Sequence, residues 1–167
     1  YLWNTGHQYG EWLIPSQTVD GVDRTNANHI DTAAYCAPIF GWNSCKIIAD
    51  TAALLGHKAD ERYYRGIASK MKTAIQKGLI AEYGKMPFDM MGGYVLAIAF
   101  DLVPESRKKS MAGHLIRKIE ENGGCLDTGF LATPYLLDAI CKTGRVDQAY
   151  QLLLQTKCPS WLYEVKQ

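Results

Sequence analysis

Hydrophobic and polar positions divide this chain of 167 residues into helical segments of two kinds. Three segments are apolar on most sides, which is typical of buried helices, and they cover about 28–55, 88–102 and 133–144. Three others carry one apolar stripe and are charged elsewhere, and they cover about 60–79, 104–122 and 146–155. No alternation of period two competes with these patterns, so the sequence predicts an all-α fold.

Residues at the segment ends support this division. Gly56 and Gly144 follow the first and fifth segments, where a glycine commonly ends a helix. Thr133 and Pro134 have the character of an N-cap and a first helical turn for the fifth segment. Pro38 lies inside the first segment, where we expect it to kink the helix.

The two kinds of segment alternate, which predicts three helical hairpins after an N-terminal loop. The loop covers residues 1–27, and the hairpins cover 28–80, 88–122 and 133–156. Such alternation is typical of an (α/α)6 toroid, in which buried helices form an inner ring and amphipathic helices cover it. A complete toroid has six hairpins, so we expect three hairpins forming part of a toroid.

The short connections make successive helices antiparallel, so the three buried helices begin at one end of the molecule. Helix N-termini are positive and favour oxygen-rich ligands. We therefore expect a site among the residues that lead into those helices. These are Tyr9, Gly10, Glu11, Trp12, His29, Asp31, Phe88, Asp89, Asp127, Thr128, Gly129 and Phe130.

The segment from Thr128 to Val165 reads TGFLATPYLLDAICKTGRVDQAYQLLLQTKCPSWLYEV. It resembles the bacterial α-L-rhamnosidases of glycoside hydrolase family 78, in which TGF-x-GTPYLL, G-x-x-D-x-AY-x-LL and PSW-x-Y-x-V occur in this order. Ala132 stands where the family commonly has glycine. The resemblance extends over nearly the whole chain, and this C-terminal part is its most specific portion.

Two further strings carry the resemblance. Residues 9–13, YGEWL, are similar to the family's G-D-W-L element, with Glu11 in place of aspartate. Residues 102–105, LVPE, are similar to its GLVPE, with Asp101 in place of glycine. Met90-Met91 stand where a Thr-Gln pair is common, which we expect to alter the floor of a pocket.

The resemblance implies an inverting glycoside hydrolase that removes terminal α-L-rhamnosyl groups from glycans or glycosides. An inverting enzyme needs an acid and a base, two carboxyl groups about 6.5–9.5 Å apart. By resemblance the general acid lies upstream of Tyr1, and the general base lies in a G-A-T-T-I-W-E segment beyond Gln167. Glu164 precedes that segment, so we assign no catalytic residue and expect residues 1–167 alone to be inactive.

The substrate-binding residues that we expect are Glu11, Trp12, Asp89, Asp127, Thr128 and Phe130. Trp12 is suited to stacking on an apolar sugar face, although a large aromatic side chain also suits a core. The acids have an alternative role as helix caps or solvated charges.

Composition excludes several other classes. Eighteen Lys and Arg against 17 Asp and Glu give a net charge of +1, so we expect no nucleic-acid partner. No apolar run approaches the ~20 residues of a membrane span. The five cysteines, odd in number and widely spaced, favour reduced thiols in a cytoplasm-like setting. The scattered histidines and the absence of nucleotide or zinc motifs predict no metal and no cofactor.

Two other functions remain open from the sequence. One is a helical-hairpin module for protein interaction, although no self-similar repeat supports it. The other is the toroid of a different glycosidase, such as an unsaturated glucuronyl or trehalose hydrolase, although the TPYLL and PSW strings favour rhamnose. Part of a toroid leaves the flanks of the first and fifth helices uncovered, so we also expect self-association.

Overall fold

The computed structural model describes residues 1–3, 5–19, 22–23 and 31–166. Their α-helices are α1 (Ala33–Leu54), α2 (Lys58–Gly78), α3 (Met91–Ala99), α4 (Lys108–Glu121), α5 (Leu136–Lys142), α6 (Val146–Leu153) and α7 (Trp161–Val165). Short 3-10 turns are η1 (Pro15–Gln17), η2 (Pro87–Asp89), η3 (Glu105–Arg107) and η4 (Thr133–Tyr135).

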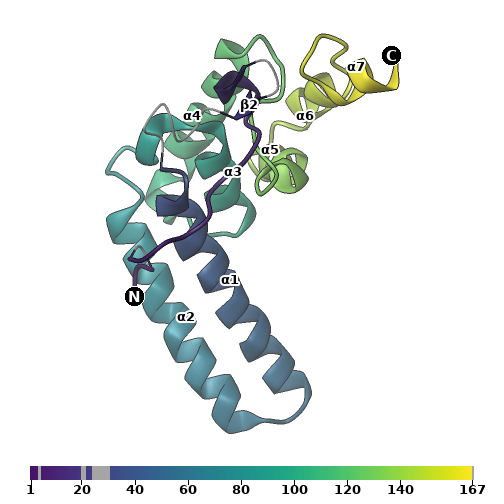
Figure 1. Ribbon diagram of the computed structural model, residues 1–167. Helices are drawn as coiled ribbons and strands as arrows, with labels where there is room; N and C mark the ends of the chain where they lie inside the picture. Colours follow the sequence, from purple (N-terminus) through teal and green to yellow (C-terminus); the bar gives the residue numbers. More distant parts are fainter. Residues whose placement is uncertain (4, 20–21, 24–30, 167) are drawn as a thin grey trace.

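The helices pair into three hairpins, α1 with α2, α3 with α4 and α5 with α6. α3 also packs against α1 and α5, so the first helices of the hairpins are neighbours. The α1–α2 hairpin is the longest and extends well away from the other helices (Figure 1). The prediction of an all-α fold with three hairpins, part of an α/α toroid, is confirmed.

The core surrounds α3, in which every residue from Met91 to Ile98 is buried. Tyr35 and Ile39 of α1 are fully buried, as are Leu136 and Ile140 of α5. A helix buried on all sides is apolar on all sides, and the sequence pattern of this segment showed that. Among the described residues, no helix has the length and apolar character to span a membrane.

Two helix starts differ from the predictions. The first helix begins at Ala33, and the predicted start at Asn28, like His29, lies outside the described residues. α1 continues through Pro38 to Leu54 as one helix. Thr133 does not cap α5; it opens η4, and its hydroxyl lies 3.1 Å from the carbonyl oxygen of Thr128 and 2.8 Å from that of Gly129.

Several elements were not predicted. The N-terminal loop contains η1 and a two-stranded antiparallel ribbon, β1 (Thr18–Val19) with β2 (Val22–Asp23). These strands are too short to produce a readable alternation. The short helix α7 was not predicted either, and Ser160 caps it, because the Ser160 hydroxyl accepts a hydrogen bond of 3.2 Å from the backbone N–H of Tyr163.

Large apolar side chains remain exposed on two helices of the outer hairpins. On α1 they are Ile47, Ile48 and Leu54, and on α6 they are Val146, Tyr150 and, just past its end, Leu154. The three α6 positions are four residues apart and form one stripe. The exposed flank of the third hairpin thus belongs to α6, whereas we expected it on α5, because α5 packs against α3, α4 and α6.

Candidate substrate-binding site

Residues 9–14 cross the ends of the first and third hairpins and are fastened to both. The backbone N–H of Glu11 donates a hydrogen bond of 2.7 Å to the hydroxyl of Thr32, the residue before α1. The backbone N–H of Phe130 donates a bond of 3.1 Å to the carbonyl oxygen of Trp12. The loop 127–132 therefore lies beside the N-terminal segment, although the two are far apart in the sequence.

Glu11 is buried within this junction, with only 6% of its surface exposed. Its Oε2 accepts a hydrogen bond of 3.0 Å from the backbone N–H of Leu131. Burial raises the pKa of the Glu11 carboxyl to about 7, against the opposing effect of the backbone N–H groups of Leu131, Ala132 and Gly129. The carboxyl group is therefore turned toward the interior.

Two glycines make room for this carboxyl group. A Cβ atom on Gly92, in the first turn of α3, would lie 2.6 Å from Glu11 Oε1. A Cβ atom on Gly129 would lie 2.5 Å from Glu11 Oε2. Because real Cβ contacts are not this short, both positions need glycine while Glu11 keeps its place.

Trp12 and Phe130 form what we call the aromatic pair. Their rings meet edge to face with centroids 5.6 Å apart. Trp12 is 57% exposed and Phe130 is 60% exposed, so the alternative of Trp12 as a core residue does not hold. Two adjacent, solvent-exposed rings held by a backbone hydrogen bond offer an apolar surface to a ligand.

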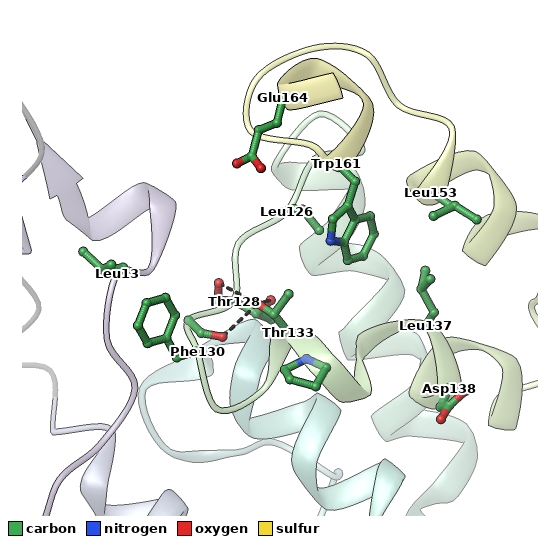
Figure 2. Close-up of a pocket in the computed structure, with 12 residues that line it drawn as sticks. Leu13, Leu126, Thr128, Phe130, Thr133, Leu137, Asp138, Leu153, Trp161 and Glu164 are labelled. Atoms are coloured by element: carbon green, nitrogen blue, oxygen red, sulfur yellow. Dashed lines mark hydrogen bonds between the residues drawn. The ribbon is translucent and has the colours of Figure 1, made fainter. Parts of the chain in front are cut away.

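Phe130 of the aromatic pair lines a cavity of about 740 Å3 (Figure 2). Its walls come from the segment after Trp12, the loop 126–130, α5, α6 and α7. The lining residues are Leu13, Leu126, Thr128, Gly129, Phe130, Thr133, Pro134, Leu137, Asp138, Leu153, Trp161 and Glu164. The Thr128 and Thr133 hydroxyls lie 2.8 Å apart, and the Glu164 side chain points from α7 into the opening (Figure 2).

Both rings of the pair line a second cavity. It is lined by Phe130 as well, and by Tyr9, Trp12 and Asp31. The rings of His7 and Tyr9 meet edge to face with centroids 5.0 Å apart, and His7 also lines this cavity. Phe130 thus lines two cavities, and both also have carboxylates in their walls.

Asp127 and Asp89 are engaged in contacts within the protein. The carboxylate of Asp127 accepts bonds from the Ser16 backbone N–H at 2.9 Å and from the Ser16 hydroxyl at 3.0 Å. This pairing fastens η1 to the loop 127–132.

Asp89 accepts a short hydrogen bond from the Tyr94 hydroxyl and pairs with Arg117 at 3.1 Å and Lys118 at 3.4 Å. Burial alone would raise the pKa of Asp89, but the Tyr94 hydroxyl and these cations outweigh it and hold the pKa below its usual value. Its carboxylate is therefore committed to α4, and Phe88 beside it is exposed.

The structure thus brings Glu11, Trp12, Thr128 and Phe130 together. Asp127, the residue before Thr128, holds η1 against the loop through its bonds to Ser16. Asp89 lines neither cavity. Sequence reasoning did not select Trp161, although its PSW string was noted, and a tryptophan inside a specific string is a usable signal. Across the described residues no three His, Cys, Asp or Glu side chains are grouped to hold a metal ion.

Comparison with known proteins identifies relatives of the whole segment. Residues 1–167 match the bacterial alpha-L-rhamnosidase 6 hairpin glycosidase domain. The chain is 35% identical over 157 residues to an alpha-L-rhamnosidase of Streptomyces avermitilis, covering 94% of this chain and 14% of that protein. It is 32% identical over 166 residues to one of Formosa agariphila, covering 96% of this chain and 17% of the relative. The chain therefore spans about one sixth of these relatives' length.

Solved structures agree. The crystal structure of the Streptomyces avermitilis alpha-L-rhamnosidase complexed with L-rhamnose superposes with a TM-score of 0.85 at 32% identity, over 99% of this chain and 15% of that one. The native enzyme from Aspergillus terreus gives a TM-score of 0.84 at 28% identity, over 99% of this chain and 19% of that one. With the family match over its full length, the chain belongs to the six-hairpin glycosidase domain of the bacterial α-L-rhamnosidases.

Proposed function

We propose that this chain is part of the catalytic toroid of an inverting α-L-rhamnosidase that releases terminal α-L-rhamnosyl groups from glycans or glycosides. The family supports the reaction class, and one relative was solved with L-rhamnose bound. The observation that carries the proposal is the exposed aromatic pair, Trp12 with Phe130, of which Phe130 lines both cavities. The same match favours rhamnose over the glucuronyl and trehalose substrates and over an interaction module.

The chemistry of rhamnose fits these rings. L-Rhamnose is a 6-deoxy sugar, so its ring carries a methyl group where most hexoses carry a hydroxymethyl group. An apolar methyl and the C–H face of the sugar pack favourably on aromatic rings. The Thr128 and Thr133 hydroxyls, 2.8 Å apart beside Phe130, offer donors and acceptors for sugar hydroxyls.

The predicted carboxylates contribute in different ways. Glu11 is buried and bonded to Leu131, and Asp127 and Asp89 are held by Ser16 and by α4. None of these three is free to transfer a proton to a glycosidic oxygen or to activate water. We therefore propose that residues 1–167 alone bind the sugar without hydrolysing its glycosides.

We also propose that the chain associates with itself through its exposed apolar flanks. Val146, Tyr150 and Leu154 on the α6 side are exposed and recur every four residues, and Ile47 and Ile48 on α1 are exposed as well. Surfaces of this kind usually acquire a partner.

The test of sugar binding is a titration with L-rhamnose, followed by tryptophan fluorescence. Trp12→Ala should abolish the change, whereas Trp3→Ala should leave it, because Trp3 is similarly exposed but packs at Gly41 of α1. L-Mannose differs from L-rhamnose only by a hydroxyl at C6 and should bind more weakly. Equal responses from both tryptophan variants would contradict the proposed site.

Turnover is tested separately with an aryl α-L-rhamnoside. We expect no release of the aryl group above background by residues 1–167. Measurable release that Glu11→Gln abolishes would disprove both the inactivity and the buried, non-catalytic role of that carboxyl group.

A further inference from the structure

Two buried oxygens from different elements converge on the first turn of α3. Glu11 Oε1 and the Tyr35 hydroxyl are both buried, and within the described part of the chain neither has a hydrogen-bond partner. A Cβ atom on Gly92 would lie 2.6 Å from the first oxygen and 3.2 Å from the second. Both oxygens therefore face the same side of Gly92, where the backbone leaves them room.

The other oxygen of Glu11 holds the third hairpin. Oε2 accepts the Leu131 N–H at 3.0 Å, and Gly129 approaches it closely enough to exclude a Cβ atom. The neighbours of Glu11 and Leu131 in the sequence are Trp12 and Phe130, whose backbones are bonded to each other at 3.1 Å. The Glu11 carboxyl group thus lies behind the aromatic pair and joins the two loop segments that carry these rings to the core.

We infer that Glu11 is a positioning residue that acts through Leu131 to hold Trp12 and Phe130 in the arrangement that receives the sugar. Ionisation of the carboxyl leaves a buried Oε1 that no hydrogen bond within the described residues stabilises. The role of Glu11 in sugar binding rests on the proposed function, whereas its effect on the position of Trp12 and Phe130 can be measured without any sugar.

The titratable groups that surround the Glu11 carboxyl come from α1 and from the adjoining loops. From α1 it faces Tyr35 and Cys36, and burial raises the pKa of both, so both stay neutral. Asp31 and Asp127 flank the same cluster from the adjoining loops. From α3 it faces Gly92, which does not titrate. Burial raises the pKa of Glu11 itself to about 7.

The experiment uses the whole chain labelled with 5-fluorotryptophan, observed by fluorine NMR as a function of pH. The Trp12 resonance is assigned by its loss in Trp12→Phe. We expect this resonance to titrate with a midpoint near 7. Glu11→Gln should abolish the titration while keeping the line position of the low-pH form, because the amide oxygen still accepts the Leu131 N–H. The buried Trp42 serves as an internal control that should not move.

Two more variants separate the contributions. Tyr35→Phe replaces the hydroxyl beside Gly92 by apolar surface close to Oε1, which disfavours the ionised carboxyl, so the midpoint should rise by a measurable fraction of a pH unit or more. His7→Gln removes the imidazole from the wall of the second cavity and should leave the Trp12 midpoint in place. An unchanged midpoint in Tyr35→Phe would show that the Tyr35 hydroxyl does not act on the Glu11 carboxyl.

The outcomes distinguish this inference from the proposed function. If Glu11→Gln leaves the Trp12 titration intact, Glu11 does not position the pair, even where L-rhamnose still shifts the Trp12 resonance. If Glu11→Gln abolishes the titration but L-rhamnose shifts no resonance in any variant, the positioning stands and the sugar assignment fails.

Discussion

The backbone N–H of Leu131 donates a 3.0 Å hydrogen bond to Oε2 of Glu11, a residue 120 positions earlier in the sequence. This bond joins the N-terminal segment to the loop that opens the third hairpin. The family commonly has aspartate at the position of Glu11, and the extra methylene of glutamate carries the carboxyl further toward α3. The close approach to Gly92 follows from that reach.

The titration of Glu11 should appear in the free energy of unfolding. Its pKa is raised from 4.5 to about 7 in the folded protein, so the folded state holds the proton more tightly than the unfolded state. This contribution is fully present below pH 4.5 and is lost as the pH rises through 7. The loss amounts to roughly 3 kcal/mol, because each tenfold difference in proton affinity between the two states corresponds to about 1.4 kcal/mol.

Urea denaturation at several pH values measures this effect. The wild-type chain should lose stability between pH 5 and 8, and Glu11→Gln should lose roughly 3 kcal/mol less over the same range, since its amide does not ionise. Parallel pH profiles for the two proteins would mean that Glu11 ionises normally in the folded state.

Gly92→Ala tests how closely the Glu11 carboxyl and Tyr35 approach α3. The new methyl group would lie 2.6 Å from Glu11 Oε1 and 3.2 Å from the Tyr35 hydroxyl, and Glu11 is confined on its other side by Gly129. We expect a loss of about 1–3 kcal/mol in the free energy of unfolding, typical of overpacking.

Gly113→Ala is the matched control, because a Cβ atom on Gly113, also inside a helix, meets nothing within 4 Å. It should stabilise the protein by about 0.5–1 kcal/mol through helix propensity. A stabilising Gly92→Ala measured by the same thermal or urea denaturation would show that the carboxyl moves away without cost.

The arrangement of the helices was predictable because burial acts on a whole segment. α3 is apolar on every side since it packs against α1, α4 and α5 at once, and that requirement is visible in the sequence itself. Trp12 and Phe130 could be selected from the sequence for a different reason, because both belong to strings that resemble motifs of the family. Pattern and resemblance together selected these residues as candidates without giving their geometry.

The direction of the carboxylates was not predictable. Asp89 follows Phe88 in a turn where both residues have positive φ, 51° and 60°, and this turn directs the Asp89 carboxylate to Arg117 of α4. Neither residue is glycine, so no local signal marks the left-handed backbone. Glu11 points inward, where the backbone N–H of Leu131 donates to it from 120 positions later, and such a contact exists only in the folded chain.

Asp89→Asn tests the ionic contacts between the η2 turn and α4. Asparagine keeps the shape and tolerates the positive φ of 51°, so the substitution removes mainly the charge. The Asp89 side chain is 24% exposed and pairs with Arg117 and Lys118, and we expect a loss of roughly 1–3 kcal/mol at neutral pH.

The pH dependence of the stability difference between wild type and Asp89→Asn tests this prediction. The pKa of Asp89 is lowered in the folded state, so its contribution is present above the unfolded pKa of about 4 and is lost as the pH falls through the lower folded value. The stability difference between wild type and Asp89→Asn, measured in urea, should therefore shrink below about pH 4. A difference that is constant from pH 7 to pH 3 would assign the loss to shape rather than to charge.

Self-association should depend on the stripe along α6. Val146, Tyr150 and Leu154 are each about half exposed or more and recur every four residues, so two copies can bury these stripes against each other. Replacing Tyr150 and Leu154 by lysine places two like charges in that contact and should shift the chain to monomer in sedimentation velocity at micromolar concentrations. Tyr83→Lys removes a comparably exposed aromatic residue outside the stripe and should not change the sedimentation coefficient. A wild-type chain that sediments as a monomer at every concentration would remove the basis for this contact, because exposed apolar area alone then fails to bring copies together.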